Sequence, residues 1–325
     1  MTIKKKKTKQ KKIFSSRDKA KKTYLKKAIA GLSLLVLLVL VAGFLAHHIL
    51  LRKQPVQPAP KIPTDKIPTN TKPTFKTPVF EIYPKEDKLL PKPDYKPKIR
   101  PKGLPKVAII IDDIGYERRV AEKFLGLDVV LTFSVFPHAP FQQRIIREAR
   151  AKGLEIMLHL PMEPDGYPEV DPGPDALLTS MSPDELIDQL NKNLDAVPLI
   201  KGVNNHMGSK ITTESTRMYQ IFSVLKKRGL FFVDSRTTPE SICKPSARLL
   251  QVPFAERDVF LDHVQEPDFI RRQIKELIRI AEIYGTAVGI AHPHLITYEV
   301  FRDELPKLQK KVRLVPASSL VHIIG

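Results

Sequence analysis

The chain has 325 residues and a formal net charge of +19 at pH 7, with 29 prolines, one cysteine and no tryptophan. Most of the positive charge precedes residue 106, and residues 106–325 are close to neutral. A domain that binds nucleic acid usually carries a strong positive charge, so the charge count argues against nucleic-acid binding by residues 106–325. The single cysteine, Cys243, excludes an intrachain disulfide and a thiolate metal cluster.

The N-terminal part of the chain predicts a membrane anchor. Residues 1–27 form a basic arm with 13 Lys and Arg against one acidic residue, and residues 28–46 (AIAGLSLLVLLVLVAGFLA) contain 19 residues without a charge. As a helix, this run spans roughly the 30 Å hydrocarbon core of a bilayer. We expect an uncleaved single-pass anchor over 28–51, in preference to a buried core helix or a cleaved signal peptide. Lysines before a first apolar span predict a cytoplasmic N-terminus and an extracytoplasmic C-terminal part, periplasmic or extracellular.

Residues 52–105 have the composition of a linker. Thirteen prolines fall within residues 54–105, many next to lysine, and large apolar side chains are few. Such a segment cannot bury enough surface to offset its ordering entropy, so we expect an extended spacer. A ligand for peptide-binding modules is the alternative interpretation of a Pro-rich segment.

From residue 106 onward, strand-like and helix-like segments alternate. Eight runs indicate buried strands: 107–111, 129–135, 155–158, 199–203, 230–233, 259–261, 287–290 and 312–315. The clearest helices are predicted over 141–152, 182–196, 213–228 and 267–284. This alternation predicts an α/β domain over 106–325 with a parallel sheet, either closed as a barrel or open and doubly wound.

Polar residues follow nearly every predicted strand, and six of the nine histidines of the chain are among them. In a (β/α) barrel the carboxyl ends of the strands meet on one face, where such folds carry their chemistry. The residues in these positions are Asp112, Asp113, His138, His159, Glu163, His206, Asp234, Arg236, Asp262, His263, His292 and His294.

Three of these residues form a candidate metal site. Asp113, His159 and His206 offer carboxylate oxygen and imidazole nitrogen, a ligand set that suits Zn²⁺ or a similar divalent ion with one position open for water. Because neighbouring side chains on a strand alternate sides, we expect Asp113 to bind the ion while Asp112 faces the reacting water as general base. His292 and His294 are the candidates for the general acid.

Structural interpretations remain open for several of these residues. The pair Asp112 and Asp113 also suits a helix cap or a turn, as does Asp234, and His138 suits a loop at the rim. Glu163 is either a metal ligand or a loop cap, and Arg236 is either a clamp for a substrate carboxylate or the ion-pair partner of Asp234. Asp262 and His263 are better suited to orienting other ligands than to binding the ion directly.

Five ordered motifs resemble the divergent polysaccharide deacetylases, a branch related to the carbohydrate esterases that remove N-acetyl groups from glycans. The motifs are IIIDDIG at 109–115, HLPMEP at 159–164, NNHMGS at 204–209, FVDSRTT at 232–238 and AHPH at 291–294. The resemblance implies a distorted barrel of seven or eight parallel strands, a divalent metal that is usually zinc, and hydrolysis of an acetamide or ester on a sugar. In the related esterases a Thr-Phe-Asp-Asp motif gives base and then ligand, which maps onto Asp112 and Asp113.

The chain departs from the related esterases at two motifs. Their HxxxH motif is replaced by His159 and Glu163, so the third ligand is either Glu163 or a residue of another strand, for which we choose His206. Their Arg-x-Pro-x-Gly motif is absent from the sequence, and residues 204–209 take its place in order.

These observations predict a membrane-anchored, extracytoplasmic, metal-dependent hydrolase that removes acetyl groups from an envelope or extracellular polysaccharide or a peptidoglycan-type substrate. The alternative is a catalytically inactive glycan-binding or envelope-assembly protein on a deacetylase scaffold. A third interpretation is a metal-dependent amidase that acts on peptide cross-links.

Overall fold

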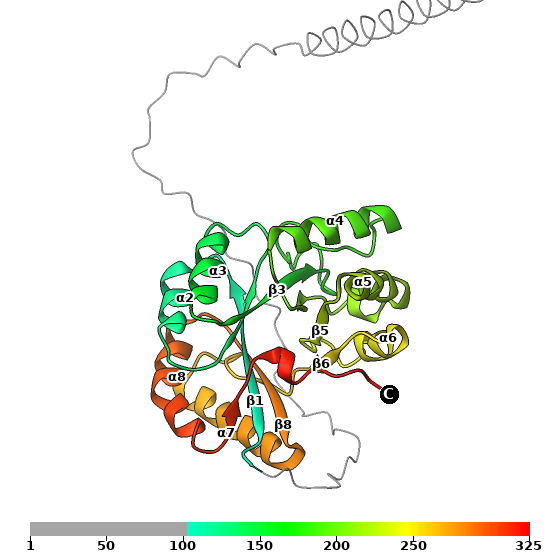
Figure 1. Ribbon diagram of the computed structural model, residues 1–325. Helices are drawn as coiled ribbons and strands as arrows, with labels where there is room; N and C mark the ends of the chain where they lie inside the picture. The colour runs from blue at the N-terminus through cyan, green and yellow to red at the C-terminus, as the bar shows by residue number, and fades with distance from the viewer. Residues whose placement is uncertain (1–102) are drawn as a thin grey trace, which may run out of the picture. The chain divides into compact units, whose positions relative to one another are not determined.

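The computed structural model describes residues 103–325 (Figure 1). The predicted basic arm, the predicted membrane anchor and nearly all of the predicted linker lie outside the described residues. Between residues 103 and 325, every helix is too short or too polar to cross a bilayer.

The described residues form one sheet in which all strand pairs are parallel, as the alternation of elements predicts. The strand order is β6-β5-β4-β3-β2-β1-β8-β7, and β9 pairs with β1 beside this path. The strands are β1 (Lys106–Ile114), β2 (Thr132–Val135), β3 (Glu155–Met162), β4 (Gly202–Met207), β5 (Phe231–Asp234), β6 (Phe254–Glu256), β7 (Val259–Phe260), β8 (Thr286–Ala291) and β9 (Arg313–Leu314).

The sheet is curled, so that side chains from distant strands meet inside it. Ile110 of β1, Met157 of β3, Val233 of β5 and Phe260 of β7 belong to one buried cluster. Strands at opposite ends of the order contribute to this cluster, which a flat sheet would not allow. The fold is therefore a distorted, incompletely closed barrel of eight parallel strands, with β6 and β7 at its two ends.

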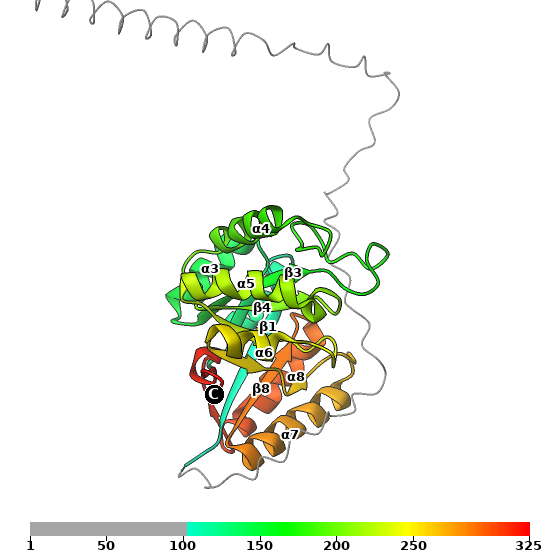
Figure 2. The ribbon, with the colours of Figure 1, turned by 90° about the vertical axis from the view of Figure 1, so that its right-hand side faces the viewer.

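Helices cover the outside of the curled sheet (Figures 1 and 2). The larger buried cluster lies between them and the outward-facing side chains of the strands, such as Ile109 and Ile111 of β1. The α-helices are α2 (Arg118–Leu125), α3 (Gln142–Ala151), α4 (Pro183–Ala196), α5 (Ser215–Arg228), α6 (Cys243–Leu250), α7 (Pro267–Tyr284) and α8 (Leu295–Leu308).

The four helices predicted from sequence are present, and local signals set their ends. Ser182 and Glu185 form a reciprocal capping box at the start of α4. Helix α5 ends at Gly229 and α7 at Gly285, and both glycines have the left-handed conformation that stops a helix.

The C-terminal segment closes the amino end of the barrel. Ala317 joins the inner cluster, and its backbone N–H donates to Oγ1 of Thr132 at 3.0 Å. The N–H of Ser318 donates to Oε1 of Glu155 at 3.0 Å. Thr132 and Glu155 begin β2 and β3, so the polar residues at the carboxyl ends of the strands lie at the other, unplugged end.

Two strands continue further than the sequence indicates. The pairing of β3 with β4 runs on to Met162 and Met207. His159 and His206 therefore lie within strands and not directly after them, which corrects the sequence-based expectation. The ladder continues through these polar residues because their side chains are buried in a hydrogen-bonded network.

Candidate metal centre

A bulge near the end of β1 places two carboxylates at one site. The register moves from Ile111 opposite Phe133 to Ile114 opposite Val135, so β1 contains one extra residue there. Asp113 in this bulge has a left-handed φ of 55°. Such a bulge re-aims side chains that a regular strand would send to opposite faces.

Both carboxylates reach the same imidazole as a result. Asp113 Oδ1 lies 3.0 Å from Nε2 of His159, and Asp112 Oδ2 lies 3.7 Å from Nδ1 of the same ring. The expectation that strand alternation separates the two acids is therefore wrong. They face two edges of His159 instead.

His206 completes a cluster of three potential ligand atoms. Its Nδ1 lies 3.2 Å from Asp113 Oδ1 and 3.1 Å from His159 Nε2. Asp113, His159 and His206 come from β1, β3 and β4, and each is less than one tenth exposed. The structure thus brings together the three residues that the sequence suggests as metal ligands.

The donor set fits a divalent ion. Ligands at about 2.0–2.2 Å from a tetrahedral Zn²⁺ stand about 3.3–3.6 Å apart, close to the 3.0–3.2 Å separations of the three donor atoms. Among the described residues, Asp113 Oδ1 and His206 Nε2 are buried polar atoms that receive or donate no hydrogen bond. Buried polar atoms are nearly always satisfied, so an unsatisfied oxygen between two imidazoles indicates a site for a cation.

Two of the three side chains of the cluster have the protonation state that a cation requires. Burial raises the pKa of the Asp113 carboxyl, but His206 and His159 outweigh burial and hold that pKa well below its usual range. Burial lowers the pKa of His206, and the neighbouring Asp113 only partly offsets this effect. Asp113 is therefore ionised and His206 neutral near pH 7, which are the forms that bind a metal.

Asn204 connects the cluster to Asp112. Its Nδ2 donates to both carboxylate oxygens of Asp112 at 2.9 Å and to Oγ of Ser235 at 3.2 Å. Its Oδ1 lies 3.0 Å from Nδ1 of His159 and accepts a hydrogen bond from Ser134. Burial raises the pKa of Asp112, and His159 offsets part of that rise.

Asn204 belongs to the motif at 204–209, but the sequence alone indicates no role for it. The available signal was its position two residues before His206 on the same predicted strand segment, which places the two side chains on one face. Ser134 was missed, because an isolated serine in a sequence carries no distinctive pattern, and Ser235 was part of the motif at 232–238 without a role at the metal site.

Phe136 forms an apolar wall beside both imidazoles. Its ring meets His159 edge to face at a centroid distance of 5.0 Å and His206 at 4.8 Å. Phe136 is 2% exposed. It limits the access of water to this side of the cluster and lowers the local dielectric.

His292, after β8, forms a buried ion pair with Asp262, after β7. Its Nδ1 donates to Asp262 Oδ1 at 2.9 Å, and its backbone N–H donates to Oδ2 at 2.8 Å. Thr297 also donates to Oδ2, at 2.8 Å. Burial lowers the pKa of His292, but Asp262 outweighs burial and raises it to about 9. Asp262 therefore orients another residue, as the sequence suggests, and that residue is His292.

His292 lies within electrostatic reach of the metal cluster. Its charge lowers the pKa of Asp112 and of His206, and Asp113 raises the pKa of His292. The ion pair of His292 and Asp262 and the Asp113 cluster therefore belong to one site at the carboxyl end of the barrel.

His294 lies near His292 and Asp262, and the potential ligand atoms of the three side chains are within 4.8 Å of one another. His294 begins α8, and its Nε2 lies 3.1 Å from Nε2 of Gln265. Burial lowers the pKa of His294. His263 packs edge to face against Phe269 at 4.5 Å, and the exposed His138 is a loop residue. Neither His263 nor His138 joins a metal-type cluster within the described residues.

Glu163 lies apart from the three-residue cluster. Its Oε1 accepts a hydrogen bond from Nζ of Lys210 at 2.6 Å, and its Oε2 accepts one from the backbone N–H of Thr179. Burial raises the pKa of Glu163, but Lys210 and Thr179 outweigh burial and lower it. The carboxylate thus holds two loops together, which favours the loop-cap interpretation.

Asp234 and Arg236 form a turn after β5. Asp234 accepts hydrogen bonds from the backbone N–H of Arg236 at 2.8 Å and from Oγ of Ser241 at 2.6 Å. The guanidinium of Arg236 pairs with Glu256 at 3.1 Å, and not with Asp234, which was its partner in one of the two interpretations left open by the sequence.

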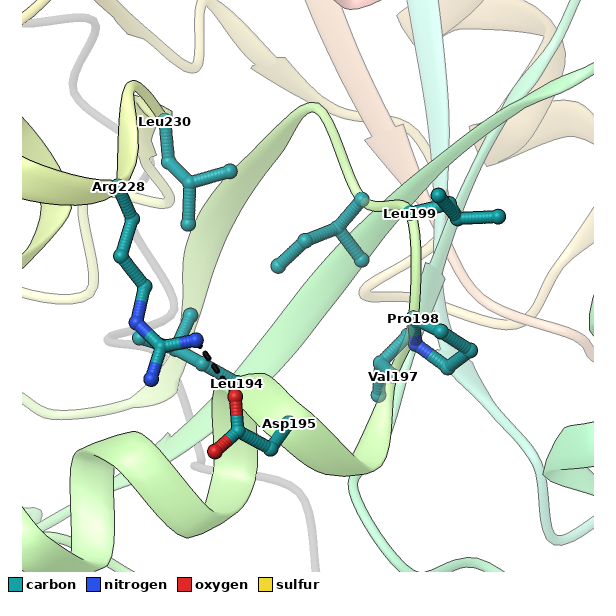
Figure 3. Close-up of a pocket in the computed structure, with 8 residues that line it drawn as sticks. Leu194, Asp195, Val197, Pro198, Leu199, Arg228 and Leu230 are labelled. Carbon is teal, nitrogen blue, oxygen red and sulfur yellow. Dashed lines mark hydrogen bonds and ion pairs between the residues drawn. The ribbon is translucent and has the colours of Figure 1, made fainter.

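A pocket of about 400 Å³ lies elsewhere in the domain (Figure 3). It is formed where α4 ends and the chain turns into β4, with Leu194, Pro198 and Leu230 among its walls. Arg228 and Asp195 form an ion pair beside it. The pocket shares no residue with the cluster of Asp113, His159 and His206.

Comparisons with known proteins agree with this architecture. A family model described as "Divergent polysaccharide deacetylase" matches residues 109–321. An uncharacterised protein of Haemophilus influenzae is 32% identical over 215 residues, which cover 66% of this chain and 76% of the relative. The uncharacterised protein YibQ of Escherichia coli K12 is 32% identical over 217 residues, or 67% of each chain.

Among solved structures, the uncharacterised protein ATU2773 of Agrobacterium tumefaciens C58 has a similar fold. The TM-score is 0.64 at 28% sequence identity, over 68% of this chain and 92% of that chain.

Proposed function

Because the chain belongs to the divergent polysaccharide deacetylase family, we propose that it is a metal-dependent hydrolase that removes acetyl groups from an envelope or extracellular polysaccharide. The observation that carries the proposal is the buried cluster of Asp113, His159 and His206, with the unsatisfied Oδ1 of Asp113 at its centre. An acid and a base flank this cluster, as hydrolysis of an amide requires.

Asp113, His159 and His206 would hold the ion, and zinc suits this ligand set best. Bound there, a divalent ion supplies Lewis-acid activation of a water molecule and of the acetyl carbonyl. Asp112 is the group placed to take a proton from the attacking water, because it is buried beside the ligands without sharing their cluster.

The same geometry favours His292 over His294 as the general acid. A pKa of about 9 keeps His292 protonated at neutral pH, so it can give a proton to the nitrogen of the leaving amine. His294 has a lowered pKa and is mostly neutral there. Asp262 would then hold the ring of His292 in place and stabilise its positive charge.

Metal content and acetate release test the proposal. We would purify the full-length chain in detergent, measure bound metal, and assay acetate release from acetylated chitooligosaccharides and from peptidoglycan. We expect activity with Zn²⁺ that is lost in Asp113→Asn and retained in Asp195→Asn, a matched change at an exposed carboxylate outside the site.

The absence of bound metal, together with no acetate release from any glycan with any divalent ion, would overturn the proposal. Sugar binding that survives Asp112→Asn, without turnover by the wild type, would favour the inactive glycan-binding protein. Release of peptide fragments in place of acetate would favour the amidase.

The localisation is part of the proposal. The uncharged run at 28–46 and the basic residues before it support a single-pass anchor with the catalytic domain outside the cytoplasm. We expect a C-terminal tag to be accessible to protease from the extracytoplasmic side of the membrane, and protection of that tag would contradict this topology. Deletion of 28–46 should release the chain from the membrane fraction.

A further inference from the structure

We propose that Asn204 is a positioning residue that serves two parts of the site with one side chain. Its amide oxygen fixes which ring nitrogen of His159 faces the ion, and its amide nitrogen holds Asp112 in place as the base. The inference deepens the proposed function and rests on it.

The orientation of the Asn204 amide follows from the chemistry of its neighbours. An ionised carboxylate only accepts hydrogen bonds, so the group of Asn204 that lies 2.9 Å from both oxygens of Asp112 must be its NH₂. The amide oxygen must then point the other way, toward Nδ1 of His159 and Oγ of Ser134. With Asp112 ionised, as its proposed role as the base requires, no other assignment satisfies both sides of the amide.

This orientation determines the tautomer of His159. The oxygen of Asn204 can only accept, so Nδ1 of His159, at 3.0 Å, must carry the proton. In the neutral ring, the lone pair is then on Nε2, which faces Asp113 at 3.0 Å and His206 at 3.1 Å. A metal-binding histidine needs such a partner on its other nitrogen.

The opposite end of the amide acts on Asp112. Its two N–H···O contacts hold the carboxylate in one orientation, 3.7 Å from the ring of His159. Asn204 is 0% exposed, and its register partner in the sheet is His159 itself. The side chain therefore cannot rotate freely, and water cannot replace it.

The two functions can be separated by substitution. In Asn204→Asp, a carboxylate oxygen still accepts from Nδ1 of His159. The amide donors to Asp112 are lost, and the two facing carboxyl groups share a proton that occupies Asp112 and prevents it from acting as the base. In Asn204→Leu, both contacts are lost. A residue with a merely structural role would not distinguish these variants in this way.

The experiment measures Zn²⁺ affinity and acetate release separately on the full-length chain. A chelator competition gives the Zn²⁺ dissociation constant, with Zn²⁺ alone as the probe. We expect Asn204→Leu to raise that constant about 10- to 100-fold. Asn204→Asp should leave it within about threefold of wild type, while kcat on an acetylated chitooligosaccharide falls at least about 100-fold.

Asn193→Leu is the matched control. Asn193 is also 0% exposed, and it donates to the backbone oxygen of Asp175 at 2.8 Å and accepts from Gln189 at 3.0 Å. Its loss should lower the melting temperature and leave the Zn²⁺ dissociation constant unchanged.

The outcomes separate this inference from the proposed function. Equal effects of Asn204→Asp and Asn204→Leu on Zn²⁺ affinity would overturn the inference while the activity of the wild type stands. If the wild type releases no acetate, but only Asn204→Leu weakens Zn²⁺ binding, the inference holds and the proposed function fails. A wild-type chain that binds no Zn²⁺ overturns both.

Discussion

Nε2 of His159 and Nδ1 of His206 lie 3.1 Å apart, although 47 residues separate them in the chain. They come from the paired strands β3 and β4, whose register places Pro161 opposite His206. A short helical or loop motif can supply two metal-binding histidines from one segment. Here the two histidines come from two neighbouring strands.

The ligand set is tested by comparing His206 with Glu163. We expect His206→Ala to weaken Zn²⁺ binding by more than about 100-fold, because it removes one of three protein donors. Glu163→Gln should leave Zn²⁺ affinity nearly unchanged, because its carboxylate is engaged by Lys210 and Thr179. Chelator competition gives both values, and a larger loss in Glu163→Gln would contradict the assignment.

The general acid is tested at His292 and His294. Loss of a positioned general acid lowers kcat about 10²- to 10⁴-fold, and we expect that loss in His292→Ala. His294→Ala should have a smaller effect, because burial lowers the pKa of its ring and leaves it mostly neutral at pH 7. Steady-state acetate release distinguishes the two, and the reverse order would show that His294 is the acid.

The ion pair of His292 and Asp262 makes the stability of the metal-free chain depend on pH. The pKa of His292 is raised from 6.5 to about 9 in the folded state, so the protonated ring stabilises the fold fully below pH 6.5. That contribution is lost as pH rises through about 9. We expect Asp262→Asn to lower the melting temperature at pH 6 and to flatten its fall between pH 6.5 and 9, measured in EDTA. The same dependence of melting temperature on pH in the wild type and in Asp262→Asn would contradict this account.

Metal binding should release a proton from His159. Burial lowers the pKa of His159, but Asp112 and Asp113 outweigh burial and raise it above 6.5. A metal ligand must be unprotonated, whereas Asp113 and His206 already are near pH 7. We expect release of about one proton per Zn²⁺ at pH 6 to 7, read from calorimetric titrations in buffers of different ionisation enthalpy. Binding without proton release would show that His159 is neutral beforehand.

Much of the fold follows from patterns that depend only on burial. Runs such as 107–111 are apolar on both faces because a parallel strand in this barrel is covered by helices outside and by side chains inside. The three-residue β6 escaped prediction, because Phe254–Glu256 is too short to show a period. Its pairing with β5 is what makes it a strand.

The site was predictable in its residue types and less so in its arrangement. Position near the carboxyl ends of strands identified Asp113, His159 and His206, because the carboxyl ends of parallel strands meet. The bulge that re-aims Asp113 depends on the register between β1 and β2, which sequence does not contain. The partners of Glu163 and Arg236, which are Lys210 and Glu256, depend on loop conformations in the same way.

A substitution at Gly115, in the turn after β1, tests how tightly the chain is packed beside the bulge. Gly115 has φ of +133°, and an added Cβ would lie 2.5 Å from Cβ of Ala139. We expect Gly115→Ala to lower the free energy of unfolding by about 1–3 kcal/mol through overpacking. Gly153→Ala is the control, because Gly153 also has a positive φ of +70° but open space around it. Its cost should be about 1 kcal/mol, and equal losses in urea unfolding would exclude the close contact as the cause.

Strand β1 connects two ends of the domain that have different surroundings. Lys106 lies at the end closed by Ala317 and Ser318, and Asp113 lies near the other end, about 23 Å away at 3.3 Å per residue. The polypeptide that precedes Lys106 therefore joins the domain at the back of the site. Under the proposed function, a glycan chain approaches the carboxyl end of the barrel without meeting this attachment point. Shortening the predicted linker at 52–105 should then reduce the thickness of the polymer layer that is deacetylated. The turnover of short soluble oligosaccharides should stay the same.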